Sequence, residues 1–193
     1  MNNEIYLTDE LIVGKGRDRV CYQHPHDSNL CIKVSISDNK QSKREVSYFN
    51  FLNKKNTDLS KISVFRGTVK TDKGLGYTFD LIRDYDKKVS KTLRQCLESQ
   101  EFSIEWIQPQ LNELKNYLIS NKICVRDISP SNISCERTPN GVNLLIIDGV
   151  SNSNINPLTI RLQSLVNTSI DKAWKGLERK LARIDRALMS NNE

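Results

Sequence analysis

The 193-residue sequence contains no apolar run near the ~20 residues that a membrane-spanning helix needs. Its first residues, 1–4, include no basic segment followed by an apolar core, so no secretory signal is visible. The five cysteines are odd in number and never form a C-x-x-C pair, which argues against a disulfide framework or a structural zinc site. These absences predict a cytoplasmic protein with reduced thiols.

Charge is plentiful but is not concentrated, because no five like charges occur in succession. The net charge is +6 and the isoelectric point is about 9.1. This excess fits an anionic partner such as ATP, nucleic acid or a membrane surface, and equally fits basic side chains spread over a solvated surface. Nucleic-acid binding would require interleaved aromatic and basic residues, and no stretch has them, so nucleic acid is disfavoured.

The stretch VRDISPSN at residues 125–132 places an acid, Asp127, five residues before an amide, Asn132. That spacing is typical of a kinase catalytic loop, in which the acid faces the hydroxyl to be phosphorylated and the amide holds a metal ion on the phosphates. Sixteen residues after Asn132, an apolar run ends in Asp148, where such a fold has its metal-binding acid. The order of these elements makes the short motif more specific than it is alone.

Residues 133–135 and 143–147 form an expected hairpin around a Pro-Asn-Gly turn. Asn132 lies at one end of this hairpin and Asp148 at the other. The sequence therefore predicts that both side chains reach one Mg²⁺ site.

The N-terminal part alternates expected strands at 10–13, 20–23 and 30–34 with turns. Gly14 and Gly16, in the turn at 14–19, would let the backbone approach the phosphates of a nucleotide, although an ordinary hairpin turn has the same pattern. The turn lacks a third glycine. Two of its basic residues, Arg17 and Arg19, are hypothesised to reach phosphate oxygens instead.

Lys33 lies inside the apolar third strand, seventeen residues after Gly16. A strand lysine commonly points to solvent, but at this place in the order it is positioned to contact the α- and β-phosphates. A helix is expected at 40–53 from its apolar spacing, and it contains Glu45. Glu45 is the candidate ion-pair partner of Lys33, or else a solvated helix glutamate.

Further strands are expected at 62–69 and 77–82, separated by a turn signal. They complete a five-stranded antiparallel sheet with one inserted helix. The backbone of Asp80, Leu81 and Ile82, where the sheet leads into the next lobe, is expected to offer hydrogen-bonding groups to a purine.

The second half is expected to be mainly helical. Residues 89–121 are expected to be helical, with an apolar stripe from Ile104 to Leu118 that is typical of core packing, and 123–125 is expected to be a short strand. A final helix at 170–188 has apolar residues every three or four positions and basic residues between them. Its stripe would pack on the rest of the lobe, form a dimer or partner contact, or lie on a membrane surface, the last being weakened by interspersed acids.

The chain resembles the YrbL family, bacterial proteins attached to the PhoP regulatory network and grouped with the protein-kinase-like fold. The resemblance rests on the glycine turn and on the segments at 21–25, 31–33, 44–48, 66–69, 71–77 and 129–135. It implies a single α+β domain over 1–193 with two lobes. The N-lobe, 1–82, would hold the five-stranded sheet and its helix, and 83–193 would form a shortened helical C-lobe.

The resemblance also implies roles for individual residues, with ATP and Mg²⁺ as cofactors. Lys33 would contact the phosphates with Glu45 beside it, Asp127 would act as the base, and Asn132 and Asp148 would hold Mg²⁺.

The chain departs from the protein-kinase pattern in several places. Val125 replaces the usual histidine, Ser129 replaces the lysine two residues after the acid, and Gly149 replaces the phenylalanine after Asp148. No Ala-Pro-Glu motif follows. The acceptor is therefore expected to be a hydroxyl of a small molecule, sugar or lipid-linked group, or of the protein itself, rather than a conventional peptide.

Two functions remain as alternatives. One is an ATP- and Mg²⁺-dependent phosphotransferase, and the other is a non-catalytic nucleotide-binding regulatory module on the same fold. Transfer or hydrolysis abolished by Asp127→Ala would distinguish them. The acceptor, the choice between ATP and GTP, and the oligomeric state are not determined by the sequence.

Overall fold

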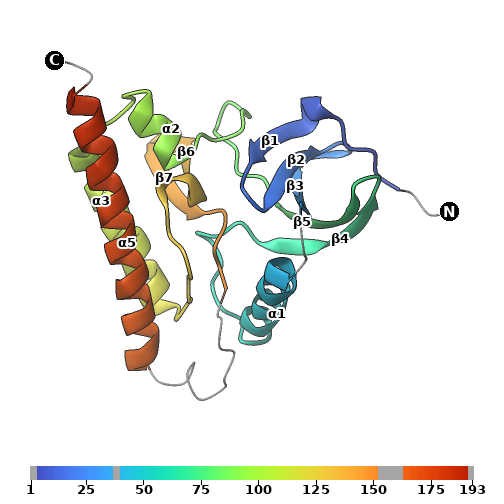
Figure 1. Ribbon diagram of the computed structural model, residues 1–193. Helices are drawn as coiled ribbons and strands as arrows, with labels where there is room; N and C mark the ends of the chain where they lie inside the picture. Colours follow the sequence, from blue (N-terminus) through green and yellow to red (C-terminus); the bar gives the residue numbers. More distant parts are fainter. Residues whose placement is uncertain (1–3, 37–39, 152–162, 191–193) are drawn as a thin grey trace.

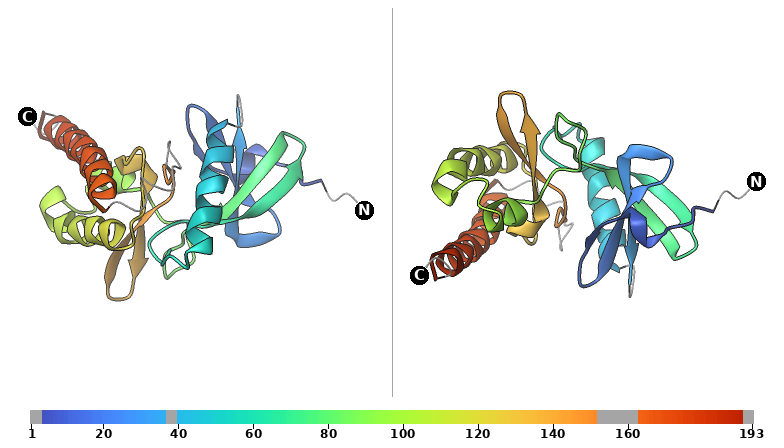
Figure 2. Two further views of the ribbon diagram at one scale, coloured as in Figure 1. Left: turned by 90° about the horizontal axis from the view of Figure 1, so that it is seen from below. Right: turned by 90° about the horizontal axis from the view of Figure 1, so that it is seen from above.

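The computed structural model describes residues 4–36, 40–151 and 163–190, with side chains of the last segment described from Val166 onward. The fold is α+β with two lobes, as predicted (Figure 1). One lobe holds a five-stranded sheet and α1, and the other holds α2, α3 and α5 with the hairpin β6–β7. The views from below and above show the same separation of the lobes (Figure 2).

The N-lobe sheet is antiparallel throughout, with the order β1-β2-β3-β5-β4. This confirms the predicted five-stranded sheet with one inserted helix. A short 3₁₀ turn, η1 (Asp9–Leu11), precedes it. The elements are β1 (Ile12–Lys15), β2 (Arg19–His24), β3 (Asp27–Ser35), α1 (Lys40–Lys54), β4 (Phe65–Thr71) and β5 (Gly74–Asp80).

Alternation along β3 places Lys33 on the inner face of the sheet. Ile32 and Val34 pack with Ile5 and other apolar residues on one side of the sheet. Successive side chains of a strand point to opposite faces, so Lys33 lies on the side that faces α1 and the other lobe. Its side chain is buried rather than solvated.

The C-lobe consists of helices and a two-stranded hairpin. Its elements are α2 (Leu93–Glu98), α3 (Ile104–Ser120), η2 (Pro130–Asn132), β6 (Ile133–Thr138), β7 (Gly141–Ile146) and α5 (Gln163–Ser190). The hairpin was predicted, and its pairing begins at Ile133 opposite Ile146.

The prediction of continuous helix over 89–121 is wrong in its middle, because the segment forms two helices. Thr92 starts α2 with a capping box, and α2 ends before Ser99. Gln100 has a left-handed φ of 53°, and Ser103 then caps the first turn of α3. The caps at Thr92 and Ser103 therefore set where the two helices begin, and the apolar stripe from Ile104 onward lies within α3.

The predicted strand at 123–125 does not form. The N–H of Ile123 donates to the carbonyl of Leu118, and that of Cys124 donates to the Tyr48 hydroxyl at 2.8 Å. These groups are satisfied without a neighbouring strand, so the segment enters the catalytic loop as an irregular chain tied to α1.

Two backbone hydrogen bonds connect the lobes directly. The Ser63 N–H donates to the carbonyl of Ile146 at 2.9 Å, and the Ile146 N–H donates to that of Lys61 at 3.0 Å. Residue Ile62 thereby forms a parallel bridge with Ile146 at the end of β7. The expected strand at 62–69 thus begins later, at Phe65, because its first residues pair with the C-lobe.

Helix α5 packs its apolar stripe inside the C-lobe. The stripe residues Ile170, Trp174, Leu177 and Leu181 are all at most 5% exposed. An ion pair of 2.9 Å between Lys115 and Asp171 adds a polar contact between α3 and α5. Of the predicted alternatives for this helix, the structure shows packing within the lobe. Among the described helices, none has the length and apolar character to cross a membrane.

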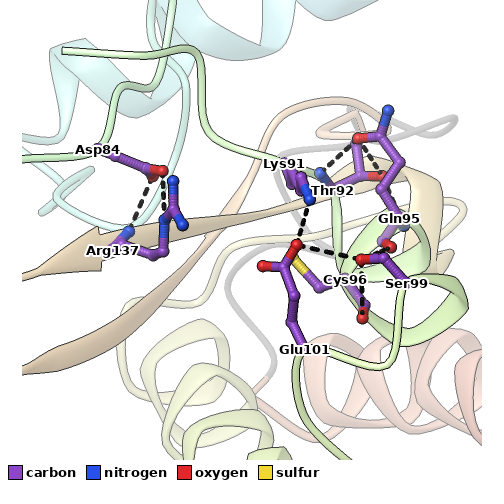
Figure 3. Close-up of polar contacts among 8 residues, drawn as sticks. All are labelled: Asp84, Lys91, Thr92, Gln95, Cys96, Ser99, Glu101 and Arg137. Atoms are coloured by element: carbon purple, nitrogen blue, oxygen red, sulfur yellow. Dashed lines mark hydrogen bonds and ion pairs between the residues drawn. The ribbon is translucent and has the colours of Figure 1, made fainter. Parts of the chain in front are cut away.

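The segment after β5 is fixed to the hairpin by a buried acid, Asp84. Its carboxylate accepts a bond from the Ser90 hydroxyl at 2.6 Å. It also accepts one from the Arg137 guanidinium at 2.6 Å (Figure 3). Burial raises the pKa of Asp84, but the bonds from Ser90 and Arg137 outweigh it and hold the pKa below its usual range. Nearby, the cap between Thr92 and Gln95 begins α2 (Figure 3).

All five cysteines are free, and four of them are buried.

Candidate active site

The backbone of Ile147, between the two lobes, brings three predicted site residues together. Its carbonyl accepts a bond of 2.6 Å from the Lys33 ammonium on β3. Its N–H donates to the carbonyl of Asn132 at 2.9 Å. Because Asp148 is the next residue, Lys33, Asn132 and Asp148 are gathered around the backbone of one residue, Ile147.

Asp148 is held by positive charge from the N-lobe. One of its oxygens, Oδ1, accepts from the Arg19 guanidinium and, at 2.6 Å, from the N–H of Gly149. Burial raises the pKa of Asp148, but the charges of Lys33 and Arg19 outweigh it and lower the pKa below its usual range. Asp148 is therefore a carboxylate at neutral pH.

Arg19 lies at the centre of the ion network. It is 8% exposed, and its second arm donates to Glu45 at 2.6 Å. Burial lowers the pKa of Arg19, but the carboxylates of Glu45 and Asp148 raise it above its ordinary value. Arg17, by contrast, is exposed and pairs with its neighbour Asp18. Of the two arginines hypothesised to reach phosphates, Arg19 is thus held by acids of both lobes.

The prediction that Lys33 forms an ion pair with Glu45 is wrong. Within the described residues, Glu45 pairs with Arg19 instead. Glu45 lies on the buried face of α1, and Arg19 at the start of β2 reaches it first. Lys33 instead donates to Ile147 and lies 4.1 Å from the centre of the Phe79 ring. Burial lowers the pKa of Lys33, but Asp148 and Glu45 outweigh this and raise it, so the lysine is charged.

Asp127 is exposed near the start of the predicted catalytic loop. Its carboxylate pairs with Lys180 of α5 at 2.8 Å, and the same ammonium lies 3.4 Å from the carbonyl of Ile128. The amide nitrogen of Asn132 donates to the backbone carbonyl of Asp127 at 3.3 Å. That bond ties the two predicted catalytic residues to each other and orients the amide oxygen of Asn132 for another partner.

Gly149 explains one departure from the kinase pattern. Its φ is +84°, and a Cβ at this position would lie 2.5 Å from the carbonyl oxygen of Asp127. The carbonyl of Gly149 also accepts from the N–H of Arg126 at 2.9 Å. The chain after Asp148 therefore crosses the catalytic loop so closely that only glycine fits.

The glycine turn and the purine-facing segment have internal partners. The N–H of Gly16 closes the turn by donating to the backbone carbonyl of Arg19 at 2.9 Å. The carbonyl of Asp80 accepts from Ser63, the N–H of Leu81 donates to Asn29, and the carbonyl of Ile82 accepts from Ser90. Purine and phosphate contacts by Gly14, Gly16 and residues 80–82 stay predictions.

The residues at the Ile147 junction suit Mg²⁺. No group of three or more His, Cys, Asp or Glu side chains that could hold a metal occurs within the described residues. Mg²⁺ usually needs only one or two protein oxygens, with water and phosphates completing its shell. Asn132 offers an amide oxygen, and Asp148 offers Oδ2, since Oδ1 accepts from Arg19 and Gly149.

Sequence reasoning missed the roles of Arg19 and Lys180. Arg19 was noted only as a possible phosphate contact, and Lys180 only as one of several basic residues in the final helix. For Lys180 a signal existed, because it lies between the stripe residues Leu177 and Leu181 and thus borders the buried face of α5.

The fold is that of the protein kinases. A solved structure described as the crystal structure of Rad53 1-466 in complex with AMP-PNP superimposes with a TM-score of 0.52 and 16% sequence identity. The match covers 74% of this chain and 37% of that chain.

Within this class, the chain belongs to the family described as PhoP regulatory network protein YrbL, which matches residues 5–182. Two relatives, each named uncharacterized protein YrbL, come from Escherichia coli (strain K12) and Shigella flexneri. Each is 34% identical over 178 residues, which cover 89% of this chain and 85% of the relative.

Proposed function

We propose that the protein is an ATP- and Mg²⁺-dependent phosphotransferase that acts on a hydroxyl group. The observation that carries the proposal is the Ile147 junction. There the Lys33 ammonium and the backbone carbonyl of Asn132 are both hydrogen-bonded to the backbone of Ile147, the residue before Asp148. A charged lysine, an ionised carboxylate and an amide oxygen are the groups that bind a nucleotide triphosphate and its metal. The structural neighbour described with bound AMP-PNP supports the same ligand class.

The residues would divide the work between two sides. Lys33 would fix the α- and β-phosphates, and Asn132 and Asp148 would hold Mg²⁺, which neutralises phosphate charge when bound. At the other side, Asp127 would orient the acceptor hydroxyl and receive its proton. The hydroxyl oxygen forms a bond to the γ-phosphorus as the bond from that phosphorus to the ADP oxygen breaks.

A second candidate, a non-catalytic nucleotide-binding regulatory module, is favoured by a specific observation. Both acids that the reaction needs are paired with basic side chains of the protein, Asp148 with Arg19 and Asp127 with Lys180. A phosphotransferase must exchange at least part of these contacts for metal and acceptor, whereas a regulatory module need not.

Thermal stability with and without Mg-ATP tests the nucleotide site. A ligand at 100 times its dissociation constant stabilises the folded state by ~2.7 kcal/mol, so wild type should melt at a higher temperature with Mg-ATP. Asp148→Asn should lose this shift, and Asp171→Asn, a change of an exposed aspartate on α5, should retain it. No shift in wild type at millimolar nucleotide would refute both candidate functions.

Phosphate release or transfer from labelled ATP then separates the two candidates. Asp127→Ala should keep the nucleotide shift and lose turnover by ~10²–10⁴-fold, the usual contribution of a general base. Wild type that binds nucleotide without turnover on any acceptor would instead identify the regulatory module.

A further inference from the structure

A cavity of about 680 Å³ lies beside the catalytic loop, between α2 and α5. The loop contributes Ser129, Pro130 and Ser131 to its wall. Ligand sites for small molecules usually measure ~300–1,000 Å³, so the cavity has a suitable size for a small molecule.

Lys180 connects this cavity to the predicted base. Lys180 lines the cavity, and its ammonium is 2.8 Å from the carboxylate of Asp127. Ser129, two residues after Asp127, lines the same cavity. A molecule bound there is therefore placed next to the acid that would receive the acceptor proton.

The charged lining favours an anion. Three cations and one acid line the cavity, namely Arg94, Lys180, Arg183 and Glu98. Arg94 pairs with Glu98 at 2.7 Å, and Lys180 pairs with Asp127. Arg183 is exposed and has no acidic partner among the described residues, so its charge is available to a ligand.

Apolar side chains form another part of the wall. Pro130, Ile184 and Leu188 line the cavity beside the cations. A ligand that satisfies both parts has an anionic group for Arg183 and a carbon skeleton for these side chains.

We propose that this cavity binds the phosphoryl acceptor, and that the acceptor is an alcohol bearing a phosphate or carboxylate group. The anion contacts Arg183 and Lys180, and the hydroxyl is directed to Asp127. As the anion engages Lys180, the ammonium is drawn from Asp127, and the carboxylate is released for the hydroxyl proton. This inference rests on the proposed function for the identity of the reaction, although the cavity and its charge do not depend on it.

Calorimetric titration without nucleotide tests the binding step separately from catalysis. The probes are glycerol 3-phosphate and, as the neutral match, glycerol. Wild type should bind the phosphorylated probe and not glycerol. Arg183→Gln should weaken that binding tenfold or more, because a charge-assisted bond to the anion is lost. Arg186→Gln removes the same charge from the same helix outside the cavity and should leave binding unchanged.

The outcomes separate the cavity from the proposed function. Equal affinity of wild type and Arg183→Gln for the anionic probe that binds would overturn the anionic-acceptor proposal alone. Binding of neither glycerol 3-phosphate nor phosphatidylglycerol vesicles by a protein that binds Mg-ATP would do the same. Binding that needs Arg183 in a protein without a Mg-ATP shift would support the anion cavity and refute the phosphotransferase.

The same anionic alcohol chemistry occurs in soluble metabolites and in lipid headgroups. A second arm therefore uses phosphatidylcholine vesicles with and without phosphatidylglycerol. Arg183-dependent binding to the anionic vesicles, without binding of glycerol 3-phosphate, would identify a lipid-borne acceptor. Arg183-dependent binding of glycerol 3-phosphate alone would identify a soluble one.

Discussion

The two acids of the candidate site are held in different ways. Asp148, whose side chain is 32% exposed, is joined to Arg19, at 8%, and through it to Glu45, at 4%. Asp127 has one cationic partner, Lys180, and the two side chains are 67% and 39% exposed. One acid thus belongs to a buried network built by β2, α1 and the chain after β7, and the other to a single solvated pair.

The difference shows which ion pairs fix the geometry of the site and which can change partners. Buried charges in a shared network are costly to separate, whereas an exposed ion pair contributes little and rearranges freely. We infer that the Asp148 side is organised in advance of nucleotide, with the lobes held in position. The Asp127 side is a single exposed ion pair, and under the proposed function it would exchange Lys180 for the acceptor.

The largest expected effect comes from breaking the buried network. Glu45→Gln should lower the free energy of unfolding by ~3 kcal/mol, because it leaves a buried guanidinium with one carboxylate instead of two. Urea denaturation of both proteins measures the change. The matched variant is Glu113→Gln, whose glutamate pairs with Lys61 at 2.8 Å but is 64% exposed, and it should cost less than ~1 kcal/mol. Similar losses in the two variants would remove the distinction between buried and exposed pairs.

A slightly smaller effect is expected where the two regions touch. Gly149→Ala should cost ~2–3 kcal/mol, since it combines a left-handed φ with a backbone contact of 2.5 Å. Gly176→Ala, within α5 and with no atom within 4 Å of the added Cβ, should instead stabilise by up to ~1 kcal/mol. Thermal denaturation gives both values. Equal behaviour of the two alanines would show that the chain does not cross the catalytic loop so closely.

The pH dependence of stability sharpens the comparison for Asp148. Its folded pKa lies below the unfolded value of ~3.9, so its ion pairs stabilise the protein fully above that value. This contribution is lost as pH falls through the folded pKa. Asp148→Asn should therefore be less stable by ~1–2 kcal/mol at pH 7 and approach wild type in strong acid. Melting temperatures between pH 7 and pH 2 test this, and a constant difference across that range would contradict it.

The smallest effect is expected at the solvated pair. Lys180→Gln should change the free energy of unfolding by less than ~1 kcal/mol. Any difference from wild type should also vanish in 1 M salt, where the screening length falls to ~3 Å. A loss comparable to that of Glu45→Gln, or one that persists in high salt, would place Asp127 and Lys180 among the structural charges.

Features encoded locally could be predicted from the sequence. The short apolar runs and the turn signals in the first half predicted the antiparallel sheet, and the Pro-Asn-Gly turn predicted the hairpin that carries Asn132 and Asp148. The five-residue spacing from Asp127 to Asn132 marked the catalytic loop. In each case, the pattern lies within a few residues of the structure that it forms.

Pairings between distant charges could not be predicted. Arg19 and Asp148 are 129 positions apart, and Lys180 and Asp127 are 53 apart. With 29 basic and 23 acidic residues, the sequence permits many such pairs. Only the packing of β2 against α1 and of α5 against the loop selects these. The assignment of Glu45 to Lys33 failed for this reason.

The backbone bonds between residues 61–63 and Ile146 bear on how the chain unfolds. They couple the segment before β4 in the N-lobe to the last residue of β7 in the C-lobe. One cluster of buried apolar residues also extends through both lobes. Neither lobe can open fully without stripping these amides of their partners. We therefore expect one cooperative transition rather than two. The amide hydrogens of Ser63 and Ile146 should then exchange with solvent only through global unfolding. Their exchange should give the same opening free energy, equal to that of the whole molecule.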